Sequence, residues 1–256
     1  MSAGLEATGL EVTGLCKRFG GIVVADAIDL AIPPGRVVGL IGPNGAGKTS
    51  FFNLVAGMVR ADAGRVRLDG TDLTRLPGYS RARLGLARTW QNLRLFPSLS
   101  VLDNLLIAPR RYPGESLAAL LRPARLRSAE YQARERAASV LERTGLAAIA
   151  HHPVADVPFG QQKLIGVARA LMNDPRCLLL DEPMAGVEGA AYGAIQRVVR
   201  DLAAAGIAIC VVEHNVAFIR DLCDEGVFMF AGRVLARGEV GTLIADPRLT
   251  ELYFGT

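Results

Sequence analysis

The chain has 256 residues, half of them hydrophobic, and carries a formal net charge of +4 at pH 7. This length and apolar content suit one large α/β domain, or a core with a subdomain. They argue against a membrane-spanning chain, because the nearest apolar stretch, Leu202–Val212, falls short of the about 18 residues that a bilayer requires. Any membrane role is therefore expected to come through a partner. The four cysteines are scattered without a CxxC pair, which argues against a disulfide framework or a zinc site and fits a reducing cytosol.

The basic charge is concentrated in the first half of the chain, where many arginines lie between positions 81 and 127. A basic surface can bind nucleic acid. However, the chain has a single Trp and no stripe in which aromatic and basic residues alternate. We expect no nucleic-acid partner, and instead a solvated face or a face near anionic lipid headgroups. The N-terminal segment Met1–Thr8 contains no basic residue, so no secretory signal is expected.

The first elements in chain order are strands followed by a strand–loop–helix unit. Alternating apolar and polar residues over Leu10–Ile32 predict antiparallel strands. Arg36–Ile41 is typical of a buried strand, and Thr49–Val55 is typical of a helix. Arg65–Leu68 predicts a further strand, which ends in a tight turn at Asp69 and Gly70.

The loop between that buried strand and that helix carries the strongest motif of the chain. It reads Gly42-Pro43-Asn44-Gly45-Ala46-Gly47-Lys48-Thr49, with Ser50 next, and two glycines five positions apart precede Lys and Thr. Glycines allow turns in which successive backbone N–H groups point at phosphate oxygens. Lys48 is then placed to reach the β- and γ-phosphates, and the Thr49 hydroxyl to ligate Mg²⁺. The loop therefore predicts a nucleoside triphosphate site, against the alternative of a glycine-rich turn without a ligand.

The middle of the chain, from about residue 92 to residue 160, has helical periodicity without strands. Val101–Ala108, Ser116–Leu121 and Ala129–Arg143 are expected to be helices that prolines, among them Pro123, separate. We interpret this segment as a helical subdomain inserted into a RecA-like core, within a single domain that spans residues 1–256.

From Gly160 onward, helices and strands alternate again. The expected helices are Gln161–Asn173, Gly189–Ala205 and Val216–Leu222; the expected strands are Cys177–Leu180 and Ile207–Val212; and a hairpin is expected at Val227–Ala236 with its turn at Gly232. Such alternation builds a parallel sheet. The predicted fold class is α/β: a P-loop NTPase core with a mainly parallel sheet, an N-terminal antiparallel β subdomain and the helical insertion.

A pair of carboxylates follows the apolar strand Cys177–Leu180. Ligands of parallel sheets bind at the carboxyl edge, to which this strand delivers Asp181 and Glu182. There Asp181 is placed to hold Mg²⁺, and Glu182 to polarise an attacking water. The simpler interpretation is two carboxylates that end a strand without a ligand.

These residues and several further motifs resemble the ATP-binding subunits of ABC transporters over nearly all of the chain. Thr89-Trp90-Gln91-Asn92 resembles the Q-loop of the family, so the resemblance implies that Gln91 contacts Mg²⁺. Val211-Val212-Glu213-His214 places His214 as the switch histidine, although a lone His at a strand end is usually structural. Phe19 matches the aromatic residue that stacks on adenine. Gly160 and Gln161 match the end of the signature motif, which would contact the ATP of a second copy.

Two motifs depart from the family pattern. Pro158 stands at the position of the signature serine and Phe159 at its first glycine, which removes a hydroxyl and an N–H group. The helix that follows still offers its N-terminus to phosphate. At the D-loop, Ala185-Gly186-Val187-Glu188 has Glu where the family has Asp. The phosphate contact of the signature motif is therefore expected to survive with fewer donors, whereas Glu188 puts the contact of the D-loop with a second subunit in doubt.

A narrower resemblance rests on Arg88–Pro97, the altered signature and Asp181–Val187. Together they are similar to the ATPase subunits of importers of branched-chain amino acids and of related urea and short-amide importers. That resemblance implies ATP and Mg²⁺ as ligands, a second ATPase subunit paired head-to-tail, permease subunits, and indirectly a periplasmic or extracellular binding protein. The place implied is the cytoplasmic face of the plasma (inner) membrane, as a peripheral subunit.

Two other readings compete with import. One is a non-transport ABC ATPase that acts on nucleic acid or ribosomes, but the chain has one cassette and no sustained heptads. The other is a module that binds ATP without hydrolysing it, against which Glu182 and His214 both argue. The sequence names neither the substrate nor whether the second subunit is a copy or a paralogue.

Overall fold

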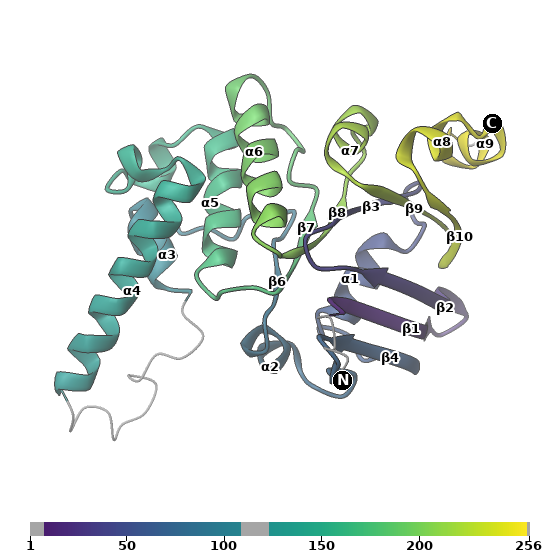
Figure 1. The fold of residues 1–256 in the computed structure, drawn as a ribbon, viewed down its shortest axis with the longest axis horizontal. Coiled ribbons are helices and arrows are strands. Elements are labelled where there is room, and N and C mark those ends of the chain that lie inside the picture. Colours follow the sequence, from purple (N-terminus) through teal and green to yellow (C-terminus); the bar gives the residue numbers. More distant parts are fainter. Residues whose placement is uncertain (1–7, 109–122, 255–256) are drawn as a thin grey trace, which may run out of the picture. The chain divides into compact units, whose positions relative to one another are not determined.

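The computed structural model describes residues 8–108 and 123–254 (Figure 1). The strands are β1 (Leu10–Phe19), β2 (Ile22–Ile32), β3 (Val37–Ile41), β4 (Ala63–Leu68), β5 (Thr71–Asp72), β6 (Leu86–Arg88), β7 (Cys177–Asp181), β8 (Ala208–Val212), β9 (Glu225–Phe230) and β10 (Arg233–Gly238). The helices are α1 (Lys48–Val55), α2 (Gly78–Arg83), α3 (Val101–Leu106), α4 (Pro123–Thr144), α5 (Phe159–Leu171), α6 (Ala190–Ala204), α7 (Val216–Leu222), α8 (Val240–Ala245) and α9 (Pro247–Phe254), with short 3₁₀ turns η3 (Ala147–Ile149) and η4 (Val154–Asp156).

The described residues form two compact units. The first comprises those within Met1–Gln91, Pro175–Ala185 and Val199–Thr256, and the second those within Asn92–Asp174 and Gly186–Val198. We call them the core unit and the helical unit. The limits of the inserted subdomain at about 92–160 stay a prediction.

The core unit contains two sheets. One has four strands in the antiparallel order β2-β1-β4-β5, and the other has six in the order β10-β9-β3-β8-β7-β6. In the second sheet every pair from β9 to β6 is parallel, and only β10 runs antiparallel to its neighbour. The prediction of a mainly parallel α/β sheet with an antiparallel N-terminal sheet is confirmed.

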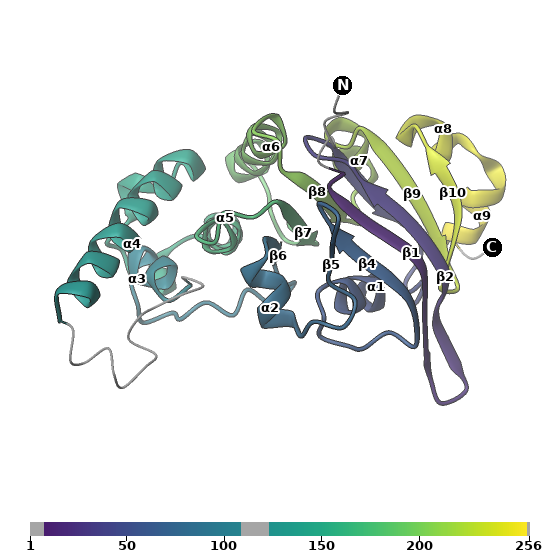
Figure 2. The same cartoon turned by 60° about the horizontal axis from the view of Figure 1, so that its bottom comes forward.

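The six-stranded sheet is covered on both faces, which explains why its strands are apolar along their whole length. On one face Val38 and Leu40 of β3 pack in a cluster with Phe51 and Phe52 of α1 and the inner residues of the antiparallel sheet. On the opposite face Phe228 of β9 packs with residues of α7, α8 and α9. Figure 2 shows the same layers from a second direction.

The helical unit consists of α3, α4, α5 and the first part of α6. Helix α4 begins at Pro123, although the sequence predicted Pro123 to separate helices and the helix to begin near Ala129. Proline is tolerated in the first turn, where its missing N–H group has no helical partner to lose, so it begins this helix. The predicted helix Ser116–Leu121 lies outside the described residues.

A buried arginine forms hydrogen bonds with the C-terminal end of α1 inside the core unit. Arg81 of α2 is only 3% exposed. Its guanidinium donates to the carbonyl oxygens of Leu54 (2.8 Å) and Val55 (2.7 Å), and also to those of Thr74 and Leu76 (2.9 Å each). The last carbonyl groups of a helix have no helical partner, so Arg81 supplies a donor to the buried Val55 carbonyl and a second donor to the Leu54 carbonyl, which also accepts the Gly57 N–H at 3.1 Å.

Replacing Arg81 with Met is expected to lower the free energy of unfolding by about 3 kcal/mol, because several buried carbonyl groups lose their donor. Urea unfolding followed by circular dichroism measures this loss. The matched control is Arg83→Met in the same helix, whose guanidinium lies 5.5 Å from the ring of exposed Tyr79 and should cost less than about 1 kcal/mol. Equal losses in the two variants would contradict a special role for Arg81.

Candidate nucleotide site

The glycine-rich loop lies between β3 and α1, in the strand–loop–helix setting that the sequence predicted. Two of its glycines are required by space as well as by conformation. A Cβ on Gly42 would lie 2.1 Å from the carbonyl oxygen of Met229, and one on Gly47 would lie 2.6 Å from that of Val24. Both glycines also have positive φ, 154° and 103°. The loop therefore passes closer to the neighbouring backbone than any side chain would allow.

Lys48 begins α1 and folds back over this loop. Its ammonium group donates to the carbonyl oxygens of Gly42 (2.5 Å) and Pro43 (3.0 Å). Burial lowers the pKa of Lys48, and the negative charges of Glu182 and Asp181 partly oppose that shift. The ammonium group is thus held at the centre of the loop, with carboxylates close enough to affect it. Thr49 and Ser50 follow in the first turn of α1, where a helix favours phosphate.

Asp181, the last residue of β7, is paired with an arginine that the sequence analysis did not assign to the site. Arg88 Nη2 lies 2.7 Å from Asp181 Oδ2, and the two side chains are only 5% and 6% exposed. Arg88 also donates to Asn53 Oδ1 of α1 (2.6 Å), and its guanidinium lies 4.5 Å from the ring of Trp90. This pair connects the helix after the phosphate loop, the carboxylate strand and the segment that leads to Gln91. The only feature of the sequence that could have indicated a role for Arg88 is its charge at the end of the short strand β6.

Glu182 brings together two residues that the sequence predicted from separate motifs. Gln91 Nε2 donates to Glu182 Oε2 at 2.7 Å. His214 Nε2 lies 3.3 Å from Glu182 Oε1. Glu182 itself has φ of 47°, in the left-handed region that residues other than glycine rarely adopt. The structure therefore gathers Lys48, Asp181, Glu182, Gln91 and His214 on the core unit.

A second buried carboxylate, Glu213, lies directly before His214 and was also missed. Its Oε1 accepts the N–H of Met184 (2.6 Å) and its Oε2 accepts the N–H of His214 (3.1 Å). Burial raises the pKa of Glu213, and these backbone N–H groups oppose the shift. The His214 carbonyl in turn accepts the Tyr253 hydroxyl at 3.4 Å.

Three further residues that the sequence predicts for the site, Phe19, Gly160 and Gln161, lie on β1 and α5. Phe19 ends β1 and is half exposed, with Lys17 Nζ 5.2 Å from its ring centroid. Gly160 and Gln161 lie in the first turn of α5, in the helical unit, where Pro158 is the N-cap residue. Phe159, half exposed, packs beside Gly186: a Cβ on Gly186 would lie 3.0 Å from its ring.

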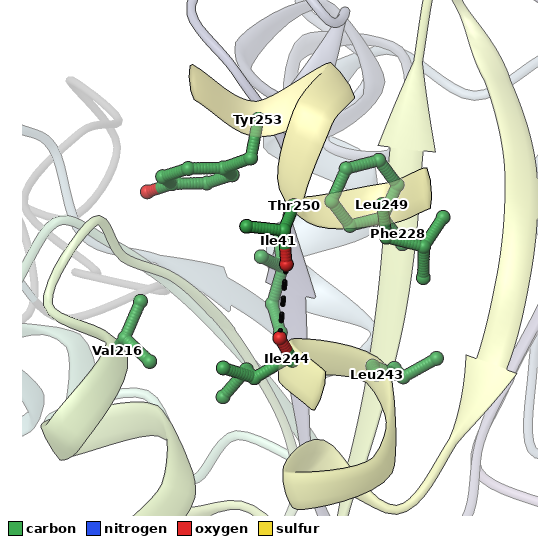
Figure 3. Close-up of a pocket in the computed structure, with 8 residues that line it drawn as sticks. All are labelled: Ile41, Val216, Phe228, Leu243, Ile244, Leu249, Thr250 and Tyr253. Atoms are coloured by element: carbon green, nitrogen blue, oxygen red, sulfur yellow. Dashed lines mark hydrogen bonds between the residues drawn. The ribbon is translucent and has the colours of Figure 1, made fainter. Parts of the chain in front are cut away.

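A separate apolar cavity of about 240 Å³ opens on the core unit behind β3 (Figure 3). The lining residues are Ile41, Val216, Phe228, Leu243, Ile244, Leu249, Thr250 and Tyr253. Its Thr250 hydroxyl already donates to the Ile244 carbonyl at 3.0 Å. A triphosphate needs cationic and N–H donors, so this cavity is no candidate for the phosphate site, although Ile41 directly precedes the phosphate loop.

No helix within residues 8–108 and 123–254 is both long enough and apolar enough to cross a bilayer. Within the same residues, no three or more His, Cys, Asp and Glu side chains are grouped to hold a metal ion by themselves.

Comparison with known proteins identifies the family. The family model described as ABC transporter matches residues 25–185. The high-affinity branched-chain amino acid transport ATP-binding protein BraF of Pseudomonas aeruginosa is 35% identical, over 96% of this chain and 97% of that protein. The lipopolysaccharide export system ATP-binding protein LptB of Acidithiobacillus ferridurans is also 35% identical, over 96% of each. A crystal structure of the ADP conformation of an ATP-binding cassette of an ABC transporter superposes with a TM-score of 0.84 at 31% identity, covering 96% of this chain and 98% of that one.

The chain belongs to the ABC transporter family. Within that family it is an ATP-binding cassette, the ATPase subunit of a transporter. The resemblance predicted from the sequence motifs is therefore confirmed.

Proposed function

We propose that this ATPase powers a membrane importer of branched-chain amino acids or of related small amino acids and amides. The observation that carries the proposal is the similarity to BraF over almost the full length of both chains. LptB, the ATP-binding protein of an export system, has the same 35% identity to this chain as BraF, so identity alone does not decide the direction of transport. The altered signature at Pro158 and Phe159 is the sequence feature that favours the importer. Family membership favours transport over an action on nucleic acid or ribosomes.

In the proposed mechanism, the loop from Gly42 to Thr49 binds the phosphates of ATP. Lys48, already held over the loop, exchanges its contacts with carbonyl oxygens for contacts with the β- and γ-phosphates. Ser50, also in the first turn of α1, belongs to the same phosphate-binding segment. Phe19 stacks on adenine from the end of β1.

The donor set at the loop fits Mg²⁺, which prefers oxygen ligands and keeps several waters. The Thr49 hydroxyl, the Asp181 carboxylate and the Gln91 amide oxygen would hold it, and the ion would neutralise charge on the phosphates. Arg88 leaves only part of the Asp181 carboxylate for this purpose, because Oδ2 is already paired.

Glu182 is the proposed general base that orients and polarises the attacking water. His214, 3.3 Å from it, is the proposed sensor of the γ-phosphate. Gly160 and Gln161 of a second subunit, at the N-terminus of its α5, would complete the site from the other side of the nucleotide. ATP would then favour the closed head-to-tail pair and hydrolysis would reopen it, which moves permease subunits at the cytoplasmic face of the membrane.

Transport into proteoliposomes tests the direction and the substrate. The chain is purified together with the membrane subunits that co-purify with it, and the complex is reconstituted with a candidate binding protein for amino acids. We expect ATP-dependent uptake of radiolabelled leucine, isoleucine or a short amide, and no uptake with Glu182→Gln, the control that should still assemble. Extraction of lipopolysaccharide from the vesicles, without amino acid uptake, would overturn import.

A further inference from the structure

Glu213 is a buried carboxylate between the two parts of the proposed catalytic group. It follows β8 directly and is only 3% exposed. Among the residues that the structure describes, its hydrogen-bond partners are backbone N–H groups rather than a cation. Burying a charge is costly unless hydrogen bonds satisfy it, so a carboxylate in this position needs an explanation.

Its two oxygens hold two different segments. Oε1 accepts the N–H of Met184, in the turn that follows Glu182, at 2.6 Å. Oε2 accepts the N–H of His214 at 3.1 Å. One side chain thereby joins the loop after β7 to the segment after β8.

The loop that Glu213 holds contains the strained residue of the site. Glu182 has φ of 47°, and its N–H donates to the Val212 carbonyl at 2.9 Å. A strained backbone of this kind persists only where neighbouring contacts over-determine it. The Val212 carbonyl fixes the loop at Glu182, and the Glu213 carboxylate fixes it again two residues later.

We propose that Glu213 is a positioning residue for ATP hydrolysis. Its carboxylate accepts hydrogen bonds from the Met184 and His214 backbones, and it thereby sets the position of the Glu182 side chain relative to His214. The inference rests on the proposed roles of Glu182 and His214. A misplacement of about 1 Å at a catalytic group can lower the rate about 100-fold, so hydrogen bonds that hold the Glu182 loop in place should affect kcat.

The chemistry requires a carboxylate and not just a polar side chain of this size. Glutamine has the same shape but offers one oxygen and one NH₂ group. In Glu213→Gln the amide can accept from Met184 or from His214, and its NH₂ group then faces the other N–H. Aspartate keeps both oxygens but is one methylene shorter, so Glu213→Asp is the milder variant.

The test measures turnover, ATP affinity and thermal stability on the full-length chain. For Glu213→Gln we expect kcat to fall by at least about tenfold, while the Kd for ATP, measured by calorimetry, stays within about threefold, because the phosphate loop is untouched. Glu213→Asp should lie between this variant and the wild type. The matched control is Glu225→Gln, the same change at a carboxylate that pairs with Arg237 at 2.6 Å, for which kcat should be unchanged.

Wild-type kcat in Glu213→Gln with a lowered Tm would show a structural role only and overturn the inference. If Glu213→Gln fails to fold, Glu213→Asp decides: unchanged kcat overturns the inference, and a lower kcat at unchanged Kd supports it. The Glu182→Gln variant distinguishes a failure of the positioning role of Glu213 from a failure of the proposed function. Full turnover in Glu182→Gln would remove the catalytic assignment itself, whereas lost turnover there with normal turnover in Glu213→Gln would remove only the positioning role.

Discussion

Replacing Glu182 with Gln is expected to lower ATP turnover by at least about 100-fold, the usual contribution of a positioned general base. Gln91 and His214 lie 2.7 Å and 3.3 Å from the two carboxylate oxygens of Glu182. The amide keeps the size of the side chain, and its single oxygen can still accept from Gln91. It cannot accept a proton from the attacking water. The loss should therefore appear in kcat and not in the binding of ATP.

Phosphate release at saturating Mg-ATP measures kcat, and calorimetry measures the Kd for ATP. Because the variant holds ATP without consuming it, light scattering after size exclusion should show a dimer that forms with ATP and dissociates when ATP is removed. The Glu225→Gln protein should behave as the wild type in all three measurements. Turnover within about threefold of the wild type would remove Glu182 from the role of general base.

The sequence was sufficient to predict the placement of those residues whose position follows from the local order of strands and helices. Lys48 and the glycines precede a helix and follow a buried strand, and this local order is retained in the structure. Asp181 ends the apolar strand β7 and His214 comes shortly after the apolar strand β8, and the ends of parallel strands meet at one edge of a sheet. Topology therefore predicts that Glu182 and His214 lie at the same edge of the sheet, but not the contact between their side chains.

Arg88 and Glu213 could not be predicted, because their importance depends on neighbours that are distant in sequence. Arg88 contacts Asn53 and Asp181, and nothing in the short strand β6 specifies either partner. In the sequence Glu213 is only the residue before His214, because its contact with the Met184 backbone forms only when β7 and β8 pair. The strained φ of Glu182 has the same origin, because glutamate has no local preference for that region.

Replacing Lys48 with Met is expected to weaken ATP binding by at least about 100-fold, since a charge-assisted contact with phosphate is lost and its worth is about 3 kcal/mol. Methionine fills a similar volume. It also removes the cost of burying an ammonium group, a cost that shows as the lowered pKa of Lys48. The two hydrogen bonds to Gly42 and Pro43 are lost at the same time. These effects on the free energy of unfolding have opposite signs, so stability should change by less than about 1 kcal/mol.

Comparison of ligands separates the loss of a phosphate contact from a general disturbance of the Lys48→Met site. Adenosine lacks the phosphates that Lys48 is proposed to contact, so its weak affinity should be the same in the wild type and the variant. ATP should lose the most affinity, AMP little, and ADP an intermediate amount. Calorimetric titration of the three nucleotides and adenosine gives this order directly. Equal losses for all four ligands would mean that the variant distorts the loop, and unchanged ATP affinity would mean that the loop is not the phosphate site. A graded loss would place the Lys48 ammonium at the β- and γ-phosphates, which is the contact on which the proposed positions of Mg²⁺ at Asp181 and of a water at Glu182 both depend.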